Sequence, residues 1–97
     1  MTWLELIELR SASPAIDQIE QQLAGLPGPN ESPGVEFYRR TLIDGDFLLT
    51  ICHRRGPVET YGSELGLRLA AALEQHGLVS HSVWTVHDNT RRQDETK

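Results

Sequence analysis

Four histidines and one cysteine are the side chains of this 97-residue chain best suited to metal binding or nucleophilic chemistry. His53 ends one apolar run, His81 and His87 stand six residues apart in another, and His76 follows a helical pattern. A zinc or iron site needs three or four ligands at about 2 Å from the ion. Residues six apart on a strand lie roughly 20 Å apart, so His81 and His87 cannot share an ion. His53 and His81 can meet only if both face the same side of a sheet. We therefore expect no metal and no other cofactor.

The sequence offers no obvious nucleophile or acid–base pair. Cys52 and His53 are adjacent, and adjacent strand residues point to opposite faces. Because a nucleophile must lie within hydrogen-bond reach of its base, we interpret Cys52 as a small buried apolar residue. Glu5 and Glu8 also face opposite ways, and we expect partly solvated carboxylates paired with arginine. The alternative is that one of them is buried in a cavity with a raised pKa. The catalytic residues, if any, stay unknown.

Nucleotide and nucleic-acid binding have little support in the sequence. Gly-Ser-Glu-Leu-Gly at residues 62–66 lacks the Lys and Ser/Thr of a phosphate-binding P-loop. The formal net charge of −5 disfavours a nucleic-acid partner, because such affinity depends largely on Lys and Arg neutralising phosphates. The apolar runs are also far shorter than the roughly 20 residues that span a bilayer. We expect a cytoplasmic protein with no nucleic-acid and no membrane partner.

The positions of these side chains depend on four predicted strands, at residues 3–10, 35–43, 47–54 and 78–87. Alternation puts Trp3, Glu5, Ile7 and Leu9 on one face of the first strand, but both of its faces carry large apolar groups, which predicts a central strand covered from each side. On the third strand, alternation predicts a helix-facing core of Phe47, Leu49, Ile51 and His53. Asp44-Gly45 predicts a tight hairpin between the middle strands.

Two helices are predicted between the strands. Ser13 followed by Pro14 predicts the start of the first helix, and apolar residues then recur at helical spacing as far as Leu26. Ser63 predicts the cap of the second helix, and Gly77 predicts a left-handed stop.

This order of elements predicts an α+β domain with the ferredoxin-like βαββαβ arrangement. We expect residues 1–87 to form a single domain, with a four-stranded antiparallel sheet and both helices on one face. Residues 88–97 contain no apolar side chain, and we expect a disordered polar tail. The other sheet face would expose large apolar groups, namely Leu4, Leu6, Tyr38, Leu42 and Leu48. A patch of that kind predicts a homodimer that packs sheet face against sheet face.

Three segments carry a resemblance to a known superfamily: the opening run at 3–9, the Pro-Gly loop and strand at 33–38, and the Asp-Gly hairpin with the strand at 44–51. As a pattern covering residues 3–87, the chain resembles the dimeric α+β barrel superfamily, which includes the antibiotic-biosynthesis-type monooxygenases. The resemblance implies a homodimer whose two sheets enclose a barrel interior.

Three functions remain open at this point. The first is a homodimeric barrel that binds a small apolar or aromatic molecule without chemistry. The second is a cofactor-independent monooxygenase-type enzyme acting on an aromatic substrate, and the third is a protein-interaction or regulatory module. The candidate pocket residues for the first two are Trp3, Tyr38, His53, His81 and Trp84.

Overall fold

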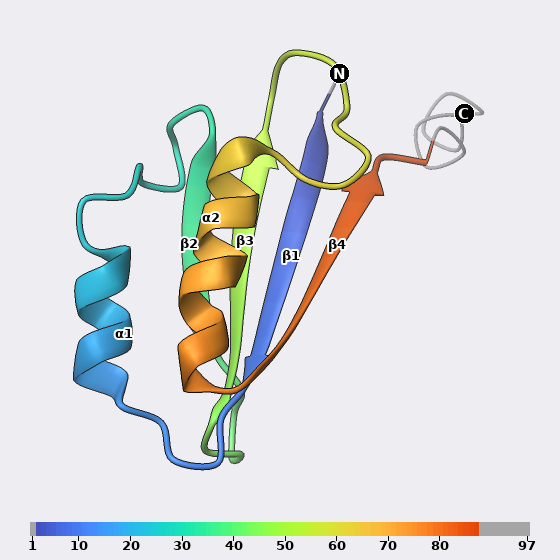
Figure 1. Ribbon diagram of the computed structural model, residues 1–97. Coiled ribbons are helices and arrows are strands. Elements are labelled where there is room, and N and C mark those ends of the chain that lie inside the picture. The colour runs from blue at the N-terminus through green and yellow to red at the C-terminus, as the bar shows by residue number, and fades with distance from the viewer. Residues whose placement is uncertain (1, 88–97) are drawn as a thin grey trace, which may run out of the picture.

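The computed structural model describes residues 2–87, so the tail predicted at 88–97 lies outside the described residues. Its elements, in chain order, are β1 (Trp3–Arg10), α1 (Ile16–Leu23), β2 (Gly34–Arg39), β3 (Asp46–His53), α2 (Glu64–Leu73) and β4 (Leu78–Thr85). The strands form one sheet in the order β2-β3-β1-β4, and every neighbouring pair is antiparallel (Figure 1). The predicted ferredoxin-like α+β arrangement is confirmed.

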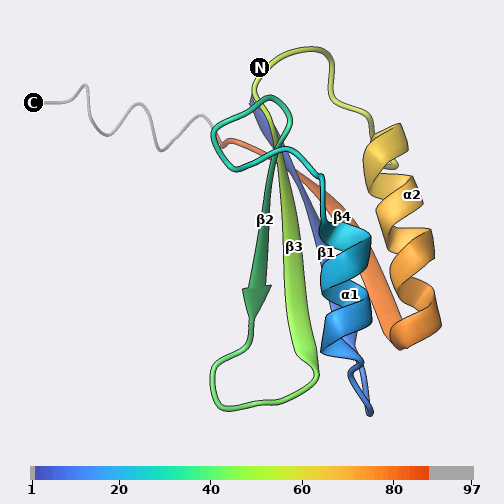
Figure 2. The same ribbon diagram turned by 90° about the vertical axis from the view of Figure 1, so that its left-hand side faces the viewer.

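Both helices lie on one side of the sheet, as Figure 2 shows in profile. The face of β3 that was predicted to meet the helices is the face that they cover. β1 is central in the sheet as predicted, but helices cover only one of its faces. Trp3, Glu5, Ile7 and Leu9 are all buried, as are Phe47, Leu49 and Ile51 of β3. Ile19 of α1 and Leu69 and Leu73 of α2 complete the core from the helix side. The core therefore lies in the single layer between the sheet and the helices.

No described segment covers the opposite side of the sheet, which we call the open face. Leu4 of β1, Tyr38 of β2 and Trp84 of β4 are exposed on it, and Leu6 and Leu48 are half-buried. Leu42, predicted for this face, instead stands in the loop after β2 and is fully exposed.

The connection between β2 and β3 is longer than predicted. β2 ends at Arg39, so residues 40–45 form the loop, and Asp44-Gly45 is not a two-residue turn. Gly45 has another role, because its carbonyl accepts a hydrogen bond from the Ser11 N–H at 2.8 Å and a Cβ on it would overlap the Ser11 carbonyl. The Arg40 N–H closes the loop by donating to the Asp46 carbonyl at 2.9 Å.

Several element ends also differ from the prediction. α1 begins at Ile16 after Ala15, which provides no side-chain cap, and Ser13 and Pro14 stay outside the helix. Ser63 does cap α2, accepting from the Gly66 N–H. The prediction of a left-handed Gly77 is wrong, because α2 ends in a 3-10 turn (Glu74–His76) and Gly77 is extended. Gly77 is required there for space, since a Cβ would overlap the Arg10 carbonyl. β4 ends at Thr85, two residues earlier than predicted.

Candidate functional site

A charged carboxylate lies in the middle of the covered sheet face. Glu5 belongs to β1, between β3 and β4, and its side chain is completely buried. His53 Nε2 lies 2.6 Å from Glu5 Oε2, and His81 Nε2 lies 2.7 Å from Glu5 Oε1. The two imidazoles reach the same carboxylate because His53 pairs with Trp3 and His81 pairs with Ile7, the inward-facing residues on either side of Glu5 along β1.

The start of α2 supplies two more donors to the same carboxylate. The Ser63 N–H donates to Glu5 Oε1 at 3.1 Å, and the Ser63 hydroxyl donates to Glu5 Oε2 at 2.5 Å. Ser63 Oγ also accepts from the Gly66 N–H at 3.0 Å. Because its proton is committed to Glu5 and neither histidine contacts it, Ser63 is a helix cap and not an activated nucleophile. We call Glu5, His53, Ser63 and His81 the Glu5 cluster.

Two glycines make room for the cluster under the helix start. A Cβ on Gly66 would overlap Glu5 Oε1, and a Cβ on Gly62 would come within 2.5 Å of His81 Cε1. Gly62 also has a φ of +106°, in the left-handed region that glycine favours. The Gly-Ser-Glu-Leu-Gly segment, which does not match a phosphate loop, therefore serves to seat a helix start on a buried carboxylate.

Competing effects act on the pKa of Glu5. Burial, the largest of them, favours the neutral acid, but the hydrogen bonds from the Ser63 hydroxyl, the two histidines and the Ser63 N–H together outweigh it. The pKa of Glu5 is consequently lowered from the ordinary value of 4.5. The positive end of the α2 dipole also favours the ionised carboxylate and so also acts to lower the pKa of Glu5. An ionised carboxylate only accepts hydrogen bonds, so each Nε2 facing it carries a proton and Nδ1 is the remaining basic nitrogen of each neutral ring.

An indole ring packs on one of these imidazoles. Trp3 and His53 stack with ring centroids 4.0 Å apart and planes inclined by 12°. Trp3 is almost wholly buried, and its Nε1 has no hydrogen-bond acceptor among the described residues. Leaving a buried donor without an acceptor costs about 1–3 kcal/mol. This N–H belongs to the indole ring that stacks on the His53 imidazole.

The cluster does not have the form of a metal site. Within residues 2–87, no group of three or more His, Cys, Asp and Glu side chains is placed to hold a metal ion. The two Nε2 atoms bond to different oxygens of Glu5, and Ser63 also donates to each of those oxygens. The geometry is that of a hydrogen-bonded carboxylate, in which both oxygens are already engaged.

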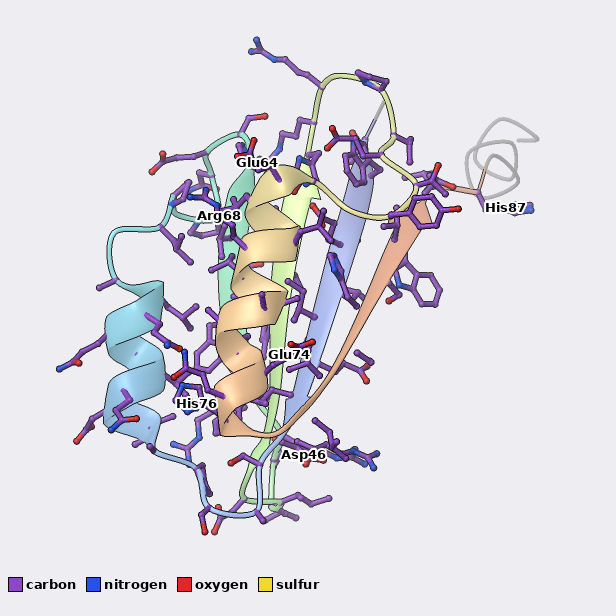
Figure 3. All side chains as sticks on the ribbon, in the orientation of Figure 1. Asp46, Glu64, Arg68, Glu74, His76 and His87 are labelled. Atoms are coloured by element: carbon purple, nitrogen blue, oxygen red, sulfur yellow. The ribbon has the colours of Figure 1, made fainter. Side chains whose placement is uncertain are left out.

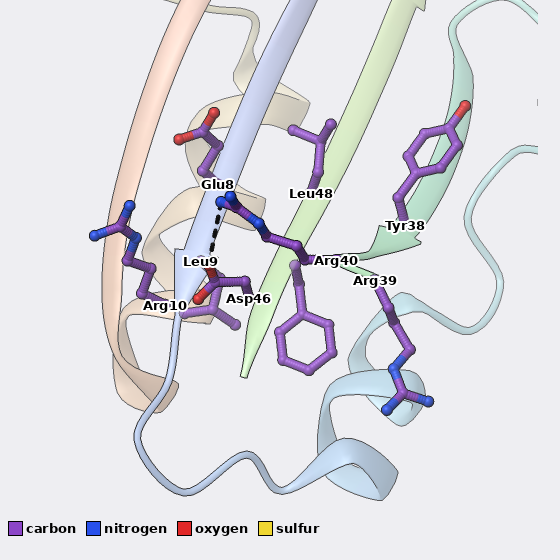
Figure 4. Close-up of a pocket in the computed structure, with 9 residues that line it drawn as sticks. Glu8, Leu9, Arg10, Tyr38, Arg39, Arg40, Asp46 and Leu48 are labelled. Atoms are coloured by element: carbon purple, nitrogen blue, oxygen red, sulfur yellow. Dashed lines mark ion pairs between the residues drawn. The ribbon is translucent and has the colours of Figure 1, made fainter. Parts of the chain in front are cut away.

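Trp84 and Tyr38, the exposed aromatic residues of the open face, each line a hollow. The first has a volume of about 390 Å³ and lies over β1 and β4; its lining is Thr2, Trp3, Leu4, Leu6, Trp84, Thr85 and Val86. The second, of about 260 Å³, lies toward the other end of the sheet, where Figure 4 shows Glu8, Arg10, Arg40 and Asp46 around it. Arg40 and Asp46 form an ion pair there at 3.6 Å.

The five pocket residues expected from the sequence separate into two groups. Trp3, His53 and His81 come together on the covered face, with Trp3 stacked on His53 and both imidazoles on Glu5. Tyr38 and Trp84 lie on the open face, on the two opposite edge strands.

The interpretation of Glu5 as a partly solvated carboxylate paired with arginine is wrong, because Glu5 is buried and its partners are histidines and Ser63. The burial of Glu5 and its need for several hydrogen-bond donors could have been inferred from the sequence. Glu5 stands at an inward position of an otherwise apolar alternating run, and a carboxylate there needs several donors. Cys52 and His53 do face opposite sides, as predicted, and Cys52 is only half-buried, on the open face.

Comparison with known proteins assigns no family: no family model, no curated protein and no solved structure matches this chain. In the described part of the chain, no helix has the length and apolar character to cross a membrane. The cytoplasmic location stays a prediction.

Replacing Glu5 tests the energetics of the cluster. Because its pKa is lowered on folding, ionised Glu5 contributes stability that is complete above the ordinary value of 4.5 and is lost as pH falls toward the lower folded value. We expect Glu5→Gln to lower the free energy of unfolding at neutral pH by about 1–3 kcal/mol. It should also flatten the loss of stability as pH falls below the ordinary value of 4.5. Urea denaturation at a series of pH values measures both.

The matched control is Glu20→Gln, at an exposed position of α1, which should change stability by less than about 0.5 kcal/mol. A Glu5→Gln variant with the wild-type stability and pH profile would contradict this account of the cluster.

Proposed function

We propose that this protein is a homodimer that pairs through its open face and holds a small apolar or aromatic molecule between the two sheets. The observation that carries the proposal is the apolar open face with the 390 Å³ hollow beside Trp84. In this proposal the chain belongs to the dimeric α+β barrel superfamily that its sequence resembles.

The apolar character of the open face supports a protein partner. Trp84 is 55% exposed, and Leu4, Tyr38, Leu78 and Val86 are exposed on the same side of the sheet. A contiguous apolar patch on a sheet face usually marks an interface, because leaving it in water forgoes about 25 cal/mol for each Å² of apolar surface. The sheet has helices on one side only, and a second layer on the other side would complete a sandwich.

The charges at one end of the face support a second copy of this chain as the partner. Glu8 and Asp46 stand near Arg10 and Arg40 around the smaller hollow (Figure 4). In a two-fold dimer each patch meets its own copy, so a surface that carries both signs can match unlike charges across the axis. Each sheet would then cover the exposed apolar residues of the other.

The lining of the larger hollow supports binding rather than chemistry at that place. Its volume lies in the usual range for small-molecule sites, and none of its seven lining residues has a titratable side chain. A cofactor-independent oxygenase needs a base to form a substrate carbanion. The described bases that are ordered by a carboxylate, His53 and His81, lie on the opposite face. The hollow therefore favours a passive binder over the monooxygenase-type alternative.

Light scattering on the purified chain tests the dimer. We expect a mass close to twice the 10.9 kDa of the monomer, and we expect Trp84→Glu to raise the dimer dissociation constant at least about tenfold by placing a charge in the apolar interface. Tyr61→Glu is the matched control, because Tyr61 is also aromatic and is more exposed than Trp84, but lies in the segment before α2. A monomeric wild-type protein would contradict the proposed dimer. It would favour the alternative that the protein is an interaction module whose open face binds another protein.

Fluorescence titration with N-phenyl-1-naphthylamine, a flat apolar probe, tests the ligand site. We expect saturable binding to the dimer and at least an about tenfold weaker affinity in Trp84→Ala, since Trp84 is the exposed aromatic side chain in the lining of the hollow. Tyr61→Ala should leave the affinity unchanged. Equal affinity for wild-type protein and Trp84→Ala would place the probe elsewhere and remove the support for this site.

A further inference from the structure

We propose that the Glu5 cluster is an acid–base site, at which His53 takes the proton of a small molecule that carries an acidic hydroxyl, such as a phenol or an enol. The cluster lies on the covered face of the sheet, and the inference does not rest on the proposed function, although Trp3 beside the cluster also lines the hollow of that function.

The contact between Glu5 and His53 prepares the imidazole as a base. The 2.6 Å bond from Nε2 to Glu5 fixes the ring orientation and leaves Nδ1 as the nitrogen that can take up a proton. A buried carboxylate on the far nitrogen also stabilises the imidazolium that forms, as in a catalytic triad. This arrangement gives His53 the features of a general base.

Trp3 supplies the complementary group beside that base. Its ring lies against the His53 ring, and its buried indole N–H lacks an acceptor among the described residues. An oxygen that has lost its proton is a strong acceptor, and hydrogen bonds to charged groups are the stronger ones. The His53 imidazole is a base, and the stacked Trp3 indole has an N–H without an acceptor. We infer a ligand whose oxygen gives up a proton to His53 and then accepts a hydrogen bond from Trp3.

Anchoring the helix does not account for the whole cluster. The start of α2 is held by the two Ser63 donors, and Ile7 and Leu9, further along the inward face of β1, belong to the hydrophobic core. Burying a carboxylate and two imidazoles is costly, and apolar residues of similar volume are often as stable or more stable. His81 is a positioning residue here, because its bond to Glu5 helps to keep that carboxylate ionised.

The segment at residues 54–62 lies beside the cluster, because its Gly62 approaches both His81 and Glu5 closely. The side chains of His53 and His81 are still 13% and 14% exposed, so solvent reaches the edges of both rings. The segment joins β3 to α2 across the upper end of the sheet in Figure 1, and its Tyr61 is largely exposed. Gly56 and Gly62 give it two left-handed positions. We expect this segment to move aside when a ligand enters.

The proposed step is a reversible proton transfer. The ligand O–H bond breaks, its electron pair stays on the oxygen, and the proton forms an N–H bond with His53 Nδ1. The imidazolium remains bonded to Glu5, and the new oxyanion accepts from Trp3 Nε1. No oxidant or other reactant is needed, and release of the neutral ligand reverses each change.

The probe is 4-nitrophenol, whose phenolate is yellow and whose phenol is colourless. At a pH where most of the free probe is protonated, wild-type protein should produce a saturable excess of phenolate. We expect His53→Gln to weaken this response at least about tenfold. Trp3→Phe keeps a stacked ring but loses the N–H, and should weaken phenolate binding by about tenfold. The matched control is His76→Gln, at the lower end of α2 in Figure 3, where His76 bonds to Gln22.

A measurement on unaltered protein guards against variants that fail to fold. In nitrogen NMR, the Nδ1 signal of His53 should change from an unprotonated to a protonated nitrogen as 4-nitrophenol is added. The proposal is overturned if that signal does not move. It is also overturned if wild-type protein gives no excess phenolate, or if folded His53→Gln gives the same excess.

Discussion

The arrangement of this protein depends on one buried negative charge. Glu5 lies in the centre of the covered sheet face and accepts from both histidines and twice from Ser63. Those bonds connect β1, β3, β4 and the first turn of α2, so a single carboxylate fixes the helix start against three strands. The buried carboxylate also constrains two residues that do not bond to it. Gly62 and Gly66 lack side chains and so leave the space that the carboxylate and imidazoles occupy.

The two faces of the sheet consequently have different chemistry. The covered face contains the charge, the oriented imidazoles and the apolar core, and the open face contains apolar side chains that line two hollows and charges of both signs at one end. The proposed ligand site lies largely on one face and the proposed acid–base site on the other, and Trp3 belongs to both. Alternation along β1 is enough to produce this separation, since Leu4 and Leu6 point one way and Glu5 the other.

Much of the fold could be predicted from the sequence, because alternation and helix capping are local signals. The helix-facing side of β3, the central position of β1 and the Ser63 cap are confirmed. Predictions failed where tertiary contacts override local preference: Gly77 is extended and is needed for close approach to Arg10, not for a left-handed stop. Gly45 has the positive φ, +92°, of a turn residue, but it lies in the loop at residues 40–45 and against Ser11, not in a two-residue turn. The site was harder to predict, because the convergence of His53 and His81 on Glu5 depends on strand order and register, which no spacing along the chain specifies.

The ionisation of Glu5 in the folded protein is the central claim, and a carbon NMR titration of its side-chain carboxyl measures it directly. The account predicts a midpoint below the ordinary 4.5, with further protonation accompanied by loss of the folded signals of His53, Ser63 and His81. A midpoint at or above 4.5 in a protein that stays folded would contradict it, because burial would then outweigh the four hydrogen bonds and Glu5 would not be the charge that organises the sheet and helix.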